Sequence, residues 1–336
     1  MANSRLARSS EIVHPSGLRL STPLLVPSFS SKGFAIRREQ SEISNYFEVA
    51  QSFLTTSVLI SAYDIAQGYI PMPDYAKADL TFVDSGGYEI SEMHDESAIN
   101  QGPVKHEEWG EERLKEIYEN WPEEIPAVFV SFDKGDEERH SLQEQIQHAR
   151  DFFTPFSHQM RTILLKSESK YDPIDVAGVI GVLEQTSDFS ILGFTEKELG
   201  SSLMQRLENI ALIRRSMDNR SIQIPIHVFG SLDPIGTVLY FLAGAEIFDG
   251  LSWLRYGYRN GVACYRDNMF VLEQGIEESL SDFYSKGIQS NYEYLLKLGG
   301  EMADFLRENS FDSFSHNVEF YRSSMESLNT RIGGAG

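Results

Sequence analysis

The sequence predicts an α/β protein built as a (β/α)8 TIM barrel, with an N-terminal hairpin, an insertion after the third strand and a C-terminal helical extension. Short apolar runs recur along the chain, and most are nearly continuous, as strands buried on both faces are. The intervals between them have the length and amphipathic pattern of crossover helices. Eight such runs are typical of a closed parallel barrel, and an open doubly wound sheet is the alternative that pattern leaves open.

The predicted strands are rich in β-branched and aromatic residues and end in turn residues or acids. They cover residues 24–30, 57–64, 80–86, 127–133, 162–168, 189–196, 224–230 and 246–252. Among the predicted helices, 138–153 and 196–215 show apolar residues at three- and four-residue spacing.

Two segments between or before these strands lie outside the repeat. Residues 12–23 carry Pro-Ser-Gly between β-prone runs and predict a hairpin that covers the bottom of the barrel. The interval 88–126 contains an acidic helix-like segment, which we interpret as an insertion over one face. We predict one domain over 1–336, with the barrel at 12–265, a helical extension at 266–330 and a loose tail at 331–336.

Composition and charge limit the function classes. Hydrophobic residues make up 41% and aromatic residues 12% of the 336 residues, which is enough for a sizeable core. No apolar run reaches the ~18 residues of a membrane span, and the start of the chain is polar, so we expect a cytoplasmic protein without a membrane partner. The net charge of −21, from 50 acids and 29 bases, argues against coating nucleic acid by bulk electrostatics but allows a local basic patch.

Acids lie at or just beyond five of the predicted strand ends, although strands disfavour aspartate. They are Asp64, Asp84, Asp133, Glu196 and Asp249. In a barrel the C-terminal strand ends point to a common centre, so these side chains are candidates for one site. We interpret Glu196 and Asp64 as helix N-caps, and Asp84 and Asp249 as the candidate catalytic pair.

The context of Asp84 is "LTFVDSGGYEIS", a strand that ends in an acid and two glycines. This pattern fits a carboxylate delivered to a point where a ligand approaches the backbone, and a tight turn capped by aspartate is the structural alternative. Paired carboxylates suit chemistry at an acetal-like carbon, where one attacks or stabilises the sugar carbon and the other moves a proton. Glycoside hydrolysis and nucleobase exchange both use this chemistry.

A series of motifs between Thr22 and Tyr321 resembles one family in order. They are "STPLLVPSFSSKG", "VDSGGYE", "SFD", "LGFTE", "GAEIFDGLSWLRYGYRNG" and "FSHNVEFY". Together they resemble the tRNA-guanine transglycosylase superfamily, which includes the queuine and archaeosine tRNA-ribosyltransferases and a DNA-modifying branch. These barrel enzymes replace guanine in a nucleic acid with a 7-deazaguanine base. The resemblance implies that Asp249 is the nucleophile that attacks C1′ and that Asp84 is the general acid and base.

The resemblance also implies a pocket for a flat base. Its members would be Ser85, Tyr88, Glu89, Asp133, Leu192, Gly193, Glu196, Phe229 and Gly230. Asp133 and Ser85 would bind the base edge, the backbone at 192–193 would complete the pocket with Glu196 behind it, and Tyr88 and Phe229 would stack on the two faces. A flat heterocycle needs such faces and an acceptor for its N–H groups.

The chain departs from the family pattern in three places. Of the family's zinc ligands only His316 remains, and the single cysteine is Cys264. We therefore predict no zinc and no other cofactor, and we interpret His316 as a hydrogen-bonded core histidine. Glu89 replaces a glutamine, which leaves the choice of incoming base open. "WLRYGYR" replaces Pro-Thr-Arg, and there Arg255 and Arg259 suit phosphate contact, with a solvated arginine pair at a helix start as the alternative.

The sequence therefore predicts a guanine transglycosylase whose partners are a nucleic acid and a free 7-deazaguanine base. tRNA is slightly favoured over DNA. A non-catalytic partner subunit and a barrel glycosidase are the alternatives of other classes. A homodimer, or a partner protein that supplies the basic surface, is left open.

Overall fold

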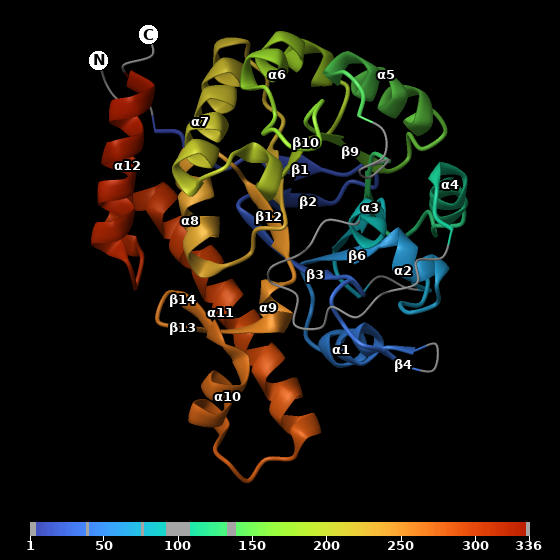
Figure 1. Cartoon of the computed structure of the whole chain (residues 1–336), viewed down its shortest axis with the longest axis vertical. Helices are drawn as coiled ribbons and strands as arrows, with labels where there is room; N and C mark the ends of the chain where they lie inside the picture. The colour runs from blue at the N-terminus through green and yellow to red at the C-terminus, as the bar shows by residue number, and fades with distance from the viewer. Residues whose placement is uncertain (1–4, 38–39, 75–76, 92–107, 133–138, 334–336) are drawn as a thin grey trace.

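The computed structural model describes residues 5–37, 40–74, 77–91, 108–132 and 139–333. Its centre is a closed barrel of parallel strands surrounded by helices (Figure 1), which confirms the (β/α)8 prediction. In barrel order the strands are β3 (Leu24–Phe29), β6 (Ser57–Ser61), β7 (Leu80–Asp84), β8 (Ala127–Val130), β9 (Met160–Leu165), β10 (Ile191–Thr195), β11 (Ile226–Phe229) and β12 (Ile247–Gly250). The last strand pairs with the first, and every pairing is parallel.

The barrel strands are buried on both faces, which is why their sequences are continuously apolar. One face of each fills the barrel interior with residues such as Val26, Phe82 and Ile247. The other face packs against the helices, as Phe29 and Phe129 do. Alternation with a period of two therefore decides which side chains can reach the barrel mouth.

Each predicted strand overlaps one barrel strand, and the ends differ by at most three residues. The second strand shows why a predicted end can be wrong. It was predicted to reach residue 64, but β6 ends at Ser61 and the chain enters α2 (Ala62–Ala66) at once. The surrounding helices include α1 (Glu42–Ala50), α5 (Leu142–Phe153), α6 (Val176–Val182), α7 (Leu203–Asn219) and α8 (Pro234–Ala243). The first predicted helix begins at residue 142 rather than 138, because Ser141 and Glu144 form a capping box there.

The acidic helix-like segment after β7, which was interpreted as an insertion, packs against the barrel. Its described part forms α4 (Glu111–Glu119), which buries Leu114 and Tyr118 against the barrel. The Tyr118 hydroxyl lies 3.0 Å from the Val83 carbonyl oxygen and 2.8 Å from that of Val130. This helix is therefore the connection between β7 and β8 rather than an insertion over one face, and residues 92–107 lie outside the described residues.

The predicted N-terminal hairpin is confirmed as β1 (Glu11–Val13) and β2 (Arg19–Ser21). Its residues Ile12, Leu18 and Leu20 pack into the interior cluster at the bottom of the barrel. His14 Nε2 lies 2.7 Å from the Gln159 side-chain oxygen at the same end. The hairpin therefore closes the end of the barrel opposite the predicted site.

The C-terminal extension is helical, as predicted, with α10 (Arg266–Gln274), α11 (Leu280–Glu308) and α12 (Val318–Gly333). α10 and the first turns of α11 extend away from the barrel (Figure 1). α12 reaches into the tail that was predicted to be loose, and residues 334–336 lie outside the described residues. None of the helices in the described part of the chain combines the length and the apolar character that crossing a membrane requires.

The remaining elements are short. They are β4 (Ile36–Arg37), β5 (Gln40–Ser41), α3 (Gly87–Ile90), α9 (Ser252–Arg255), β13 (Tyr256–Arg259), β14 (Val262–Tyr265) and the 3-10 turns η1 (Leu183–Thr186), η2 (Glu196–Leu199) and η3 (Phe311–Ser313). The β13–β14 hairpin turns at Asn260 and Gly261, whose φ angles are 50° and 78°. Two consecutive positive φ angles at Asn-Gly are the hairpin turn that this dipeptide favours.

Candidate active site

Asp249 lies in β12 with its side chain on the interior face, like Ile247 two residues earlier. Ser28 Oγ donates to Asp249 Oδ2 at 2.8 Å, and His227 Nε2 lies 2.9 Å from Asp249 Oδ1. The Asp249 side chain is 8% exposed. The carboxylate is therefore fixed from both sides within the barrel mouth.

Two stacked aromatic rings lie next to the Asp249 carboxylate. The rings of His227 and Phe229, two residues apart on β11, stack with centroids 3.8 Å apart and planes at 24°. A Cβ atom added at Gly193 would lie 2.6 Å from Phe229 Cε2, so a glycine is needed for the ring to lie there. Two predicted pocket residues, Gly193 and Phe229, are thus in contact, while the Leu192 side chain packs outward against the helices. Gly230 follows with a φ of 86°, which suits the turn out of the strand.

Asp84 is the last residue of β7, as predicted, and is half-buried. The Gly86 backbone N–H donates to Asp84 Oδ2 at 3.3 Å, and Trp109 Nε1 donates to the Ser85 carbonyl at 3.0 Å. Gly86 has a φ of 82°, and an added Cβ would lie 2.8 Å from both Trp109 Nε1 and Tyr63 Cβ. The two features that sequence posed as alternatives, a capped turn and an acid at the mouth, therefore coexist.

A second pair of acids, Asp64 and Glu89, is fully buried near Asp84. Burial raises the pKa of Asp64 well above its usual range, and the charges of Glu89 and Asp84 raise it further. The Ser31 backbone N–H donates to Asp64 Oδ2 at 2.7 Å and acts in the opposite direction. Close carboxyls in low dielectric cannot both ionise at low cost, so this pair favours keeping a proton.

Burial also raises the pKa of Glu89, which lies at a position where the family that the sequence resembles has a glutamine. The hydroxyls of Ser30 and Ser61 and the charge of Lys32 oppose this shift. A protonated Glu89 would both donate and accept, as an amide does.

Glu89→Gln should therefore gain stability relative to the wild type as the pH rises from about 4 to about 8. Because the pKa of Glu89 is raised, the folded wild type holds a proton at pH values where the unfolded chain has already released it, so its free energy of unfolding falls as the pH rises through this interval; the amide has no such proton. Urea midpoints of both proteins across this pH range measure the difference. The exposed Glu123 provides the control, Glu123→Gln, and a difference independent of pH would contradict the prediction.

The interpretation of Asp64 and Glu196 as helix N-caps is wrong. Asp64 is the third residue of α2, and its partner is in the loop after β3. Glu196 follows the N-cap, Thr195, and its Oε1 accepts hydrogen bonds from Tyr240 Oη at 2.7 Å and Arg206 Nη1 at 2.9 Å. Burial raises the pKa of Glu196, and these two partners lower it. The carboxylate thus links β10 to α7 and α8 behind the barrel wall.

The other predicted base-stacking residue, Tyr88, packs against the outer core, whereas Phe229 belongs to the interior cluster. Lys32 Nζ lies 4.5 Å from the Tyr88 ring centroid and donates to the Tyr88 carbonyl at 2.6 Å. A base sandwich between Tyr88 and Phe229 therefore stays a prediction. Asp133, the predicted base-edge residue, lies outside the described residues.

The two predicted phosphate-binding arginines have different surroundings. Arg255 is 3% exposed, its Nη2 donates to the Lys32 carbonyl at 2.8 Å, and its guanidinium lies 5.7 Å from the Phe34 ring centroid. Arg259 is exposed on β13. The alternative interpretation, a pair of solvated arginines, is wrong for Arg255. Arg259 remains the candidate for phosphate contact on the surface.

His316 is half-buried rather than part of the core and lies against the tip of the β13–β14 hairpin at Gly261. The neighbouring Asn317 donates to the Gly261 carbonyl at 2.8 Å. Among the described residues, no group of three or more His, Cys, Asp or Glu side chains could hold a metal ion.

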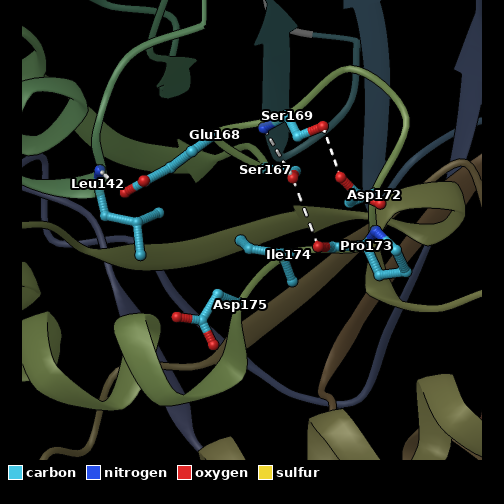
Figure 2. Close-up of a pocket in the computed structure, with 8 residues that line it drawn as sticks. All are labelled: Leu142, Ser167, Glu168, Ser169, Asp172, Pro173, Ile174 and Asp175. Carbon is cyan, nitrogen blue, oxygen red and sulfur yellow. Dashed lines mark hydrogen bonds between the residues drawn. The ribbon is translucent and has the colours of Figure 1, made fainter.

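A cavity of about 160 Å³ lies beside the loop between β9 and α6 (Figure 2). Its lining is mostly apolar surface and consists of Leu142, Ser167, Glu168, Ser169, Asp172, Pro173, Ile174 and Asp175. None of these is a predicted site residue. Comparisons with family models and with curated proteins gave no match for the chain.

The structure adds one residue that sequence reasoning missed, His227. Its signal was present, because a histidine two residues before Phe229 in "IPIHVFG" lies on the same strand face as that ring. Its partner Asp249 comes from the neighbouring strand.

Proposed function

We propose that the protein is a guanine transglycosylase that exchanges guanine in a nucleic acid for a 7-deazaguanine base. The observation that supports it most is the setting of Asp249 in the barrel mouth. Each of its carboxylate oxygens has a hydrogen-bond partner, and the stacked rings of His227 and Phe229 lie next to it. Asp84 ends another strand of the same mouth. The fold alone is compatible with many activities, so the proposal rests on these side chains.

In the first half-reaction, an Asp249 oxygen forms a bond to C1′ as the bond from C1′ to guanine N9 breaks. The electron pair of that bond passes to the guanine ring, which takes a proton from Asp84. In the second half-reaction, N9 of the incoming base bonds to C1′, the Asp249 carboxylate leaves, and the base loses its proton to Asp84. The mechanism is the same on ribose and on deoxyribose.

The polynucleotide is proposed to be tRNA, with DNA as the alternative. Arg259 is an exposed cation on the hairpin that follows β12 and α9, where a backbone phosphate could be bound. The net charge of −21 works against any other broad attraction for nucleic acid. A basic partner chain would relieve this repulsion.

Guanine-for-guanine exchange tests the proposal without knowledge of the incoming base. We expect radiolabelled guanine to enter total tRNA or duplex DNA, assayed separately, and Asp84→Asn to lower the rate by about 100-fold or more, since general acid–base catalysis contributes that much. Label in one polymer would also identify the substrate.

The matched control is Asp79→Asn, which changes an exposed aspartate just before the opposite end of β7 and should leave exchange unchanged. No label in either polymer, with a folded wild-type protein, would count against the proposal. An unaffected rate in Asp84→Asn would remove Asp84 from the mechanism and leave it as the residue that caps the turn.

A further inference from the structure

His227 is a fully buried histidine with one polar partner in the described part of the chain. Its Nε2 lies 2.9 Å from Asp249 Oδ1, and its Nδ1 is buried without a hydrogen-bond partner among the described residues. One ring face stacks on Phe229, and Phe82 packs against it edge-on with centroids 5.5 Å apart. The imidazole is therefore held in an apolar setting and directed at the carboxylate.

This setting fixes the place of one ring hydrogen. An ionised carboxylate only accepts hydrogen bonds, so Nε2 must carry the hydrogen that points to Asp249. The arrangement thus places a ring hydrogen on Nε2, between the imidazole and the carboxylate.

We propose that His227 is the positioning residue of the Asp249 nucleophile and that it promotes breakdown of the covalent intermediate. This inference rests on the proposed function. Hydrogen bonds to an ionised oxygen are stronger than those to a neutral ester oxygen, so the contacts from His227 and Ser28 stabilise Asp249 most when it is a free carboxylate. They fix its plane before attack and favour its departure afterwards.

The step concerned is the second half-reaction. N9 of the incoming base forms a bond to C1′ while the bond from C1′ to the Asp249 oxygen breaks, and the electron pair of that bond returns to the carboxylate. The proton of the incoming base goes to Asp84, so no other reactant is needed. The negative charge thus returns to the Asp249 carboxylate, where the donors Ser28 and His227 are already in place.

Single-turnover trapping of the protein–polynucleotide adduct tests this role. We expect His227→Ala to slow release of the adduct by about 10- to 100-fold after addition of free guanine, somewhat less than the roughly 100- to 1,000-fold cost of losing an oxyanion-hole donor, because Ser28 still donates to Asp249. His227→Gln, whose amide N–H can still reach Asp249, should recover most of the release rate. His14→Gln changes a buried histidine at the bottom of the barrel and should release the adduct at the wild-type rate.

A readout independent of activity is the imidazole nitrogen NMR spectrum of the full-length protein. The His227 signals should show hydrogen on Nε2, and Asp249→Asn should move them. Equal adduct lifetimes in the wild type and His227→Ala would overturn the inference. If that variant does not fold, the spectrum decides, and the absence of hydrogen on Nε2, or His227 signals unchanged by Asp249→Asn, would overturn it.

The two proposals fail in different ways. No adduct from the wild type with either polymer would count against the proposed function itself. The spectrum would then test the pairing alone, and the absence of hydrogen on Nε2, or signals unchanged by Asp249→Asn, would contradict it.

Discussion

Asp249→Asn should abolish the covalent adduct with nucleic acid and lower base exchange by at least about 1,000-fold, because removal of a covalent nucleophile leaves only the catalysis that binding and electrostatics supply. The amide is close in shape to the carboxylate and can still accept from Ser28 Oγ, which donates to the acid at 2.8 Å. The change therefore removes the nucleophile without emptying the site. Denaturing gels of trapped reactions and guanine exchange rates measure the two effects.

Asp151→Asn serves as the control, since Asp151 is an exposed acid in α5 on the outside of the barrel. It should form the adduct as the wild type does. A persistent adduct in Asp249→Asn would assign the nucleophile to another residue.

Arg214→Met should lower the free energy of unfolding by about 3–5 kcal/mol, the cost of leaving one member of a buried ion pair without its partner. Arg214 Nη2 lies 2.6 Å from Glu246 Oε2, and both side chains are 0% exposed. Arg214 Nε also donates to the Gly244 carbonyl, and burial lowers the Arg214 pKa to about 10. The pair joins α7 to the lower end of β12, so its loss should affect stability rather than the mouth.

Arg215→Met on the same helix is the matched control. Arg215 is partly exposed and donates to the Ile332 carbonyl, so its replacement should cost about 1 kcal/mol or less. Urea unfolding followed by circular dichroism measures both. Equal costs for the two variants would contradict the prediction, whereas a second change, Glu246→Leu, should restore part of the stability lost in Arg214→Met.

The barrel could be predicted because parallel strands buried on both faces have recognisable sequences, but their ends could not. "SVLISAYD" continues its β-prone pattern to residue 64, and the switch to α2 at residue 62 has no local signal. The β13–β14 hairpin did have one, the Asn-Gly pair at residues 260–261, but the same stretch was interpreted as a recognition segment rich in arginine.

Parts of the candidate site followed from chain position, since Asp84 and Asp249 lie at the C-terminal ends of their strands as predicted. The contact between His227 and Asp249 depends on the register of β11 against β12, in which His227 pairs with Ile247. Sequence does not specify that register. The burial of Arg255 was equally inaccessible, because its acceptor, the Lys32 carbonyl, is 223 residues away along the chain.

The hairpin at the bottom of the barrel has a consequence for the order of events. Since Ile12, Leu18 and Leu20 fill that end, small molecules enter and leave the described interior by the mouth. Under the proposed function, guanine and its replacement then occupy the same space beside Phe229 and cannot be bound there together. Departure of the first base must precede arrival of the second, which gives ping-pong kinetics: parallel double-reciprocal plots, with free guanine competing against the incoming base.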